Sequence, residues 1–64
     1  MESIKNKFLD NLCKNNKQVS VYLISGIQLV GTILAYCDDG IYFYGKGLKQ
    51  FVFNHAISTI QENL

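Results

Sequence analysis

The sequence predicts a small, mainly β domain in which one N-terminal helix precedes five short antiparallel strands. Apolar residues near the start recur at helical spacing. The rest of the chain is rich in β-branched and aromatic residues, divided by Gly and Asp turns. Gly31 lies inside the longest expected strand and indicates a sharp bend, as at a barrel corner. We therefore expect one domain over residues 1–64, with the strands forming a strongly bent sheet and a small open barrel.

The helix is expected over residues 4–15. Ile4, Phe8 and Leu12 recur every four residues, and Leu9 widens this apolar stripe. Such a stripe buries one side of the helix against the sheet and leaves the polar side in water.

Both ends of this helix carry recognisable signals. Ser3 is the expected N-cap, because its hydroxyl can accept a backbone N–H of the first turn. Asn15 and Asn16 predict the end of the helix, because Asn tolerates the left-handed conformation. Asp10 and Lys14 have the spacing of an ion pair on the exposed side.

The expected strands are separated by turns and by one polar corner. The strands cover residues 18–24, 27–37, 41–45, 48–54 and 56–61. The turns are a two-residue hairpin at Ser25-Gly26, then Asp38-Asp39-Gly40 and Gly45-Lys46-Gly47. Asn54-His55 forms the corner before the last strand.

The size of the chain predicts an oligomer. A 64-residue domain buries only about 60% of its unfolded surface and usually needs disulfides, a metal or a partner. Cys13 and Cys37 form no Cys-x-x-Cys pair, and one His leaves too few ligands for structural zinc. We expect no metal and no cofactor. A disulfide is an alternative, although free thiols are expected in a reducing compartment.

The chain shows no sign of a membrane segment. No apolar run approaches the ~20 residues of a membrane span. The first residues lack the apolar core of a signal peptide. We expect a cytoplasmic protein without a membrane partner.

The most specific stretch lies between Phe51 and Thr59. His55-Ala56-Ile57-Ser58-Thr59 resembles, residue for residue, the second Sm motif of the Hfq family, the bacterial Sm-like RNA chaperones. Phe53 and Asn54 stand where that family commonly has Tyr and Lys. The first Sm motif is similar to Val19-Ser20-Val21-Tyr22-Leu23, Gly26-Ile27, Leu29 and Gly31.

This resemblance implies a fold, an assembly and a function. The fold is the Sm-like fold, and the assembly is a homo-oligomeric ring, expected to be hexameric. The function is that of an RNA chaperone that binds A-rich, and in some cases U-rich, single-stranded RNA. The partners are small regulatory RNAs and messenger RNAs, in post-transcriptional regulation and the stress response.

The resemblance also implies a distal face that binds purines. Tyr22 is its strongest candidate: a strand Tyr is often only half-buried packing, but here it can stack on a base, worth about 1–3 kcal/mol per base. Gln28 and Val30 depart from the cation and the Gln expected there. We call the expected residues the distal set: Tyr22, Gly26, Ile27, Gln28, Leu29, Val30, Gln50 and Thr59.

A second, proximal face is implied around His55, facing the pore and U-rich ends. Asn54 replaces the usual Lys, Gly40 stands where an aromatic residue stacks on uracil, and Asp39 replaces a neutral amide. Lys5 can supply a contact where the family has Gln. These residues, Lys5, Asp39, Gly40, Asn54 and His55, are the proximal set.

The lateral rim is implied at the end of the helix. Lys14 and Lys17 are the cations that stand there in this sequence. Lysine is a point charge without the planar fork of Arg, so we expect weaker annealing on this rim than in Arg-rich relatives.

Two other function classes are alternatives. Asp38, His55 and Ser58 can be drawn as a catalytic triad, but no elbow glycines surround Ser58 and no oxyanion hole is evident, so we expect no enzyme activity and no catalytic residues. The other alternative is an Sm-like ring that serves as a structural or protein-interaction module with weak RNA binding. The net charge of only +1 favours it.

Overall fold

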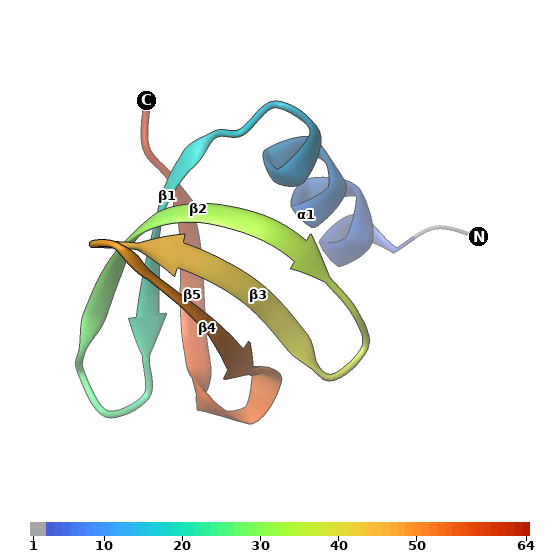
Figure 1. Ribbon diagram of the computed structural model, residues 1–64. Coiled ribbons are helices and arrows are strands. Elements are labelled where there is room, and N and C mark those ends of the chain that lie inside the picture. Colours follow the sequence, from blue (N-terminus) through green and yellow to red (C-terminus); the bar gives the residue numbers. More distant parts are fainter. Residues whose placement is uncertain (1–2) are drawn as a thin grey trace.

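The computed structural model describes residues 3–64 as one helix and a five-stranded antiparallel sheet (Figure 1). The order of the strands is β4-β3-β2-β1-β5, so the sheet is unclosed, with β4 and β5 at its two edges. This confirms the predicted fold class. The elements are α1 (Ile4–Lys14), β1 (Gln18–Leu23), β2 (Gln28–Tyr36), β3 (Gly40–Gly45), β4 (Leu48–Phe53), the 3₁₀ turn η1 (Asn54–Ala56) and β5 (Ile57–Glu62).

The helix begins and ends at the predicted signals. The hydroxyl of Ser3 accepts the backbone N–H of Asn6 at 3.0 Å. Asn16 has a φ of +49°, which stops the helix in the left-handed region. The ammonium of Lys14 lies 3.1 Å from the carboxylate of Asp10, as expected for residues four apart.

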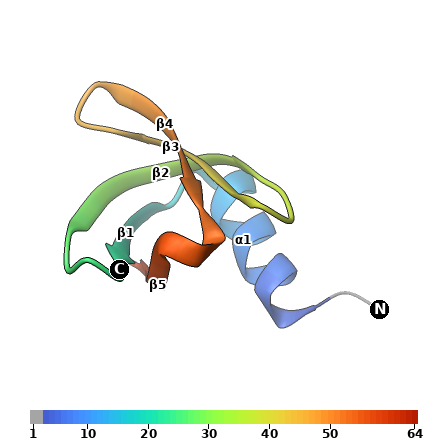
Figure 2. The same ribbon diagram turned by 90° about the horizontal axis from the view of Figure 1, so that it is seen from below.

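The apolar stripe of α1 is shorter than predicted. Leu9 and Leu12 are buried, and Phe8 packs against the core. Ile4 is 88% exposed, because the first turn of the helix lies beyond the edge of the sheet it covers (Figure 2). The stripe therefore starts at Phe8, and the prediction for Ile4 was wrong.

The β1–β2 connection is a three-residue loop, where two residues were expected. The N–H of Leu23 donates to the carbonyl of Ile27 at 2.8 Å, and Gly26 N–H donates to the Leu23 carbonyl at 2.9 Å. Gly26 has a φ of +96°. A turn followed by a glycine in the left-handed region is a common three-residue hairpin, and it matches the twist of the strands.

The β3–β4 connection is a tight two-residue hairpin. Gly45 pairs with Leu48, and both residues between them have positive φ, +52° at Lys46 and +76° at Gly47. This is the pattern of the type I′ turn, in which Gly costs nothing and another residue is strained.

The long strand β2 curves over the whole molecule and joins its two halves (Figures 1 and 2). It pairs with β1 through its first half and with β3 through its second, with a bulge between Ile33 and Ala35. A Cβ at Gly31 would lie 2.1 Å from the carbonyl oxygen of Tyr44. Glycine is thus required here because the β3 backbone approaches β2 too closely for any side chain.

The core lies inside the bend, between α1 and the concave side of the sheet. Every strand except β5 contributes a buried side chain, and Ile57 and Ile60 of β5 pack against the cluster. Burying one such side chain stabilises the fold by about 1.5–3 kcal/mol. The buried core residues are Leu9, Leu12, Val19, Val21, Ile33, Ile41, Phe43 and Val52.

The two cysteines are free thiols in different surroundings. Cys13 is half-buried in the last turn of α1, whereas Cys37 is exposed just after β2. Burial, and to a lesser degree the nearby Asp10 carboxylate, raise the pKa of the Cys13 thiol. Within residues 3–64, no three His, Cys, Asp or Glu side chains gather to hold a metal ion, and no helix is long and apolar enough to cross a membrane.

Replacing Gly31 by Ala should destabilise the protein by about 1–3 kcal/mol, because the new methyl group meets the backbone of β3. Gly47→Ala is the matched control: its Cβ would meet nothing within 4 Å, and only the positive φ is strained, at a cost of about 1–2 kcal/mol. Urea unfolding at one fixed protein concentration measures both changes. A smaller loss for Gly31→Ala than for Gly47→Ala would contradict the close approach.

Cys37 should react with iodoacetamide well before Cys13, because only the thiolate attacks and Cys13 is both covered and raised in pKa. Mass spectrometry of the Cys37→Ser and Cys13→Ser variants gives the two rates separately. The raised pKa leaves less thiolate at a given pH, so the Cys13 rate should still be climbing at pH values where an ordinary thiol has levelled off. Prior treatment with reductant should change neither rate, and equal rates for the two thiols would refute this assignment.

Candidate nucleic-acid interface

Tyr22 lies in register between two other members of the distal set. On β1 it pairs with Gln28 of β2 on one side and with Thr59 of β5 on the other. Directly opposed residues of antiparallel strands present their side chains on the same face, with Cβ atoms about 4.5–5.5 Å apart. The sheet therefore places a half-buried aromatic ring between an amide and a hydroxyl, a combination that suits stacking together with base-edge hydrogen bonds.

The side-chain amide of Gln28 is oriented by a short chain of hydrogen bonds. Its Nε2 donates to the hydroxyl of Ser20 at 3.3 Å, and that hydroxyl donates to Oδ1 of Asn63 at 3.2 Å. Ser20 is buried, and the backbone N–H of Asn63 is bonded to the carbonyl of Gln18. Because one N–H of the Gln28 side-chain amide is bonded to Ser20, the side-chain carbonyl oxygen is left to accept a hydrogen bond from a ligand.

A hollow between the start of β2 and the β3–β4 hairpin gathers the next part of the distal set. Gln50 of β4 faces the first residues of β2 across it, although 20 or more positions separate them in the chain. The residues that line it are Gln28, Leu29, Val30, Phe43, Gly45, Lys46, Leu48 and Gln50. We call it the distal hollow. Gln28 also belongs to the group of Tyr22, Gln28 and Thr59, which we call the Tyr22 surface, and so connects it with the distal hollow.

Gly26 and Ile27 complete the distal set in the exposed β1–β2 loop. Ile27 is 56% exposed, so its apolar side chain is accessible to a ligand beside the polar groups of this face. Tyr22 and Thr59 do not line the distal hollow, so the distal set divides into a Tyr22 part and a hollow part that share Gln28.

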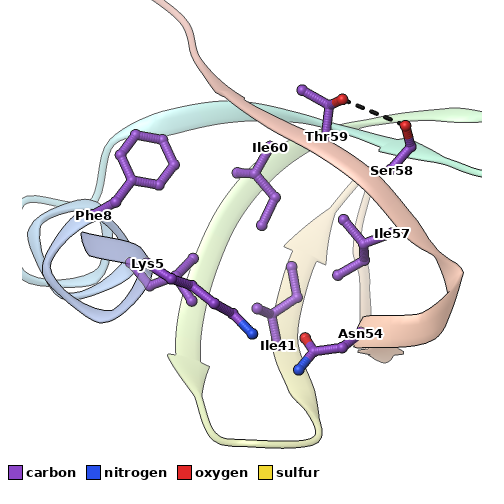
Figure 3. Close-up of a pocket in the computed structure, with 9 residues that line it drawn as sticks. Lys5, Phe8, Ile41, Asn54, Ile57, Ser58, Thr59 and Ile60 are labelled. Carbon is purple, nitrogen blue, oxygen red and sulfur yellow. Dashed lines mark hydrogen bonds between the residues drawn. The ribbon is translucent and has the colours of Figure 1, made fainter. Parts of the chain in front are cut away.

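A second, larger hollow lies beneath β5 and brings together two members of the proximal set (Figure 3). Its volume is about 300 Å³. Lys5 reaches into it from the start of α1, and Asn54 faces Lys5 from η1, while Ile57 and Ile60 form an apolar floor. Ser58 and Thr59 lie at the edge, where their hydroxyls are 3.4 Å apart. Thr59 thus borders both the Tyr22 surface and this proximal hollow.

Asn54 has a structural task that its sequence position did not reveal. Its Nδ2 donates to the carbonyl of Asp38 at 2.6 Å, and its backbone N–H donates to the carbonyl of Asp39 at 2.8 Å. The side chain that replaces the family's Lys therefore secures the β2–β3 turn to η1. The carboxylates of Asp38 and Asp39 remain exposed, and their negative charge disfavours the binding of an anionic nucleic acid at this turn.

His55 lies at the exposed corner and stacks on Phe53, with ring centroids 5.7 Å apart and an interplanar angle of 21°. Phe53 in turn meets Phe51 edge to face at 4.9 Å. Within residues 3–64, no hydrogen bond or ion pair joins His55 to Asp38 or Ser58. The backbone carbonyl of Asp38 accepts from Asn54, and the hydroxyl of Ser58 is bonded to that of Thr59. The drawn triad is not assembled in this part of the chain.

Gly40 has no room for a side chain. It was placed where an aromatic ring would stack on uracil, but it is buried at the start of β3, paired with Phe53. A Cβ at Gly40 would lie 2.2 Å from the carbonyl oxygen of Val52. No ring can stand at this position without displacing β4, so the exposed residues of this turn are Asp38 and Asp39.

The two rim lysines are both paired with acids. Lys14 binds Asp10 at 3.1 Å, and Lys17 binds Glu62 at 3.3 Å. These exposed pairs add little to stability, but they offset the positive charge that the rim was expected to present.

Sequence reasoning missed several residues beside these candidates. Ser20 and Asn63 form the hydrogen bonds that support Gln28. Lys46 and Leu48 border the distal hollow, and Phe53 stacks on His55. Only Phe53 had a signal in the sequence, its place beside His55. The others depend on how the curved β2 brings the β3–β4 hairpin and the last residues of the chain together.

Comparison with known proteins gives a consistent result. Residues 4–63 match the family model "Hfq protein". The RNA-binding protein Hfq of Brevibacillus brevis is 42% identical over 57 residues, 89% of this chain and 72% of that protein. The RNA-binding protein Hfq of Alkaliphilus metalliredigens is 34% identical over 58 residues, 91% of this chain and 72% of that protein.

The fold of a solved structure agrees as well. A crystal structure of Hfq, described as a pleiotropic translational regulator, superposes with a TM-score of 0.90 at 30% identity. The match covers 92% of this chain and 98% of the other.

Proposed function

Because the chain belongs to the Hfq family, we propose that it is a non-catalytic RNA chaperone that binds single-stranded RNA and brings small regulatory RNAs and messenger RNAs together. The observation that carries the proposal is the register of β1, which sets Tyr22 between Gln28 and Thr59 on one face. Aromatic stacking with polar groups beside the ring is the usual means by which proteins hold unpaired bases.

The distal set supports a preference for purines. A base stacked on Tyr22 has the Gln28 carbonyl oxygen beside it as an acceptor, held by Ser20. An acceptor at this point suits the exocyclic amino group of adenine. We therefore assign A-rich RNA to this face.

We assign a ring to the assembly, and a hexamer as its size. The sheet of one chain leaves the outer edges of β4 and β5 unpaired, and such edges invite pairing with another chain. On β4, Phe51 and Phe53 are 41% and 51% exposed, an apolar surface that a neighbour can cover. Joining β4 of one copy to β5 of the next is a heterologous contact, which closes when the rotation allows a ring.

Repetition in a ring strengthens weak contacts. One RNA strand that engages several subunits gains affinity through the high effective concentration of the next site. A Tyr22 surface that binds one base weakly is therefore sufficient when every subunit supplies one.

The proximal set supports weaker binding of U-rich RNA. Lys5 and Asn54 face each other across the proximal hollow and His55 is exposed beside it. The side-chain amide of Asn54 is bonded to the backbone carbonyl of Asp38. The carboxylates of Asp38 and Asp39 are both exposed in this turn. We assign this face a secondary role.

A second candidate function is an Sm-like ring that acts as a structural or protein-interaction module and binds RNA weakly. The pairing of Lys14 and Lys17 with acidic side chains favours it, because this pairing reduces the positive charge of the rim. Nucleic acid that copurifies with the protein, together with RNA gel shifts, supports the chaperone. Their absence supports the module.

A charge on the exposed face of β4 should separate the subunits. Phe51→Asp tests the contact between subunits more specifically than a change at Val52. Val52 is buried in the core of its own chain, so a charge there would unfold the subunit whether or not it is assembled. Sedimentation should show an oligomer for the unmodified protein and smaller species for Phe51→Asp. A folded monomer for the unmodified protein at micromolar concentration would overturn the ring.

Oligo-A should bind more tightly than oligo-U of equal length. Tyr22→Ala should remove about 1–3 kcal/mol per occupied site from oligo-A binding and leave oligo-U binding little changed. Asn54→Lys should strengthen oligo-U binding and steepen its salt dependence, because each new phosphate contact releases counterions. Fluorescence anisotropy titrations of each protein with each oligonucleotide measure these affinities. Tighter binding of oligo-U, unaffected by changes at Asn54 or His55, would show that the faces are assigned wrongly.

A further inference from the structure

The β3–β4 hairpin ends in an exposed cation beside the distal hollow. Lys46 borders this hollow together with Gln28, Val30 and Gln50. It also borders a shallower depression on the other side of the hairpin, lined in part by Gln18 and Thr32. One ammonium group can therefore reach either side of the ridge that the hairpin forms over β2.

Backbone packing holds the base of this cation in place. A Cβ at Gly45 would lie 2.5 Å from the carbonyl oxygen of Val30, and a Cβ at Gly31 would lie 2.1 Å from that of Tyr44. The two glycines let the hairpin lie directly on β2. Lys46 follows Gly45 in a turn with a φ of +52°, so its Cα is fixed while its side chain extends into water.

The charge of Lys46 is not neutralised by any residue that the structure describes. No carboxylate of residues 3–64 lies within ion-pair distance of it, in contrast to Lys14 and Lys17. Neither the distal hollow nor the depression beside it is lined by an acidic residue. Lys46 therefore adds a positive charge that no acidic lining residue offsets, and the polar side chains beside it, Gln28 and Gln50, are neutral.

We propose that Lys46 binds backbone phosphates of the single-stranded RNA whose bases occupy the Tyr22 surface and the distal hollow. This inference rests on the proposed function, and it adds an electrostatic contact to a face whose other assigned residues are all uncharged. A flexible lysine suits this task, because it can follow a phosphate between the two sides of the hairpin without reading the base.

The test is the salt dependence of oligo-A binding. Lys46→Asn removes the charge and keeps a residue that tolerates positive φ. Lys49→Gln is the matched control, since Lys49 lies in the same hairpin, opposite Tyr44, but lines neither hollow. Anisotropy titrations at salt concentrations spanning a tenfold range give the slope for each protein, with sedimentation to verify that the assembly is unchanged.

Lys46→Asn should lower the slope by about 0.7 for each phosphate that the lysine no longer neutralises, so that affinity falls about fivefold less over a tenfold rise in salt. Lys49→Gln should keep the slope of the unmodified protein. Lys46→Arg should also keep it, because the positive charge remains beside the same hollow.

An unchanged slope for Lys46→Asn, or an equal reduction in Lys49→Gln, would overturn the assignment while leaving oligo-A binding by the protein intact. Failure of the unmodified protein to bind oligo-A at low salt would overturn the proposed function, and the Lys46 contact with it. An oligo-U slope reduced as much as the oligo-A slope would also refute the assignment, because it would show a general charge effect.

Discussion

The close approach of two backbones at Gly31 shapes most of this molecule. With no side chain between them, β3 can lie against β2 at a distance that only glycine allows. The curved β2 then carries the β3–β4 hairpin over the start of the same strand. The distal hollow lies between the start of β2 and this hairpin. A backbone constraint thus helps to arrange the residues that line the hollow.

Features that depend on neighbouring residues could be predicted from the sequence. The Ser3 cap, the Asp10–Lys14 pair and the left-handed Asn16 each need only a few adjacent positions, and each was expected. The hidden roles of Gly40 and Asn54 could not be predicted in this way, because both depend on where β4 crosses the β2–β3 turn. The local pattern at Gly40 fits an exposed turn residue equally well, and only packing shows that its missing side chain leaves room for the Val52 carbonyl.

In the candidate site, too, some features could be predicted from the sequence and others depend on long-range contacts. Tyr22, Gln28 and Thr59 meet because strand register fixes them, and the motif resemblance had already grouped them. The Ser20–Asn63 support is a long-range contact between the first strand and the last residues of the chain, which no pattern in the sequence indicates. Its effect is to determine which end of the Gln28 amide is free, so a distant residue influences what kind of base edge the surface can accept.

The two unpaired edges of the sheet have a further consequence. A strand edge that accepts a copy of its own chain can extend without limit, and only the angle between the two edges decides whether the chain of copies closes. Within one subunit, the curvature of β2 helps to set the angle between the edges at β4 and β5, because β2 lies between them in the sheet. If copies join through these edges as proposed, the bend in this one strand contributes to the number that closes a ring. Straightening the bend would then favour an open filament, even with both edges unchanged.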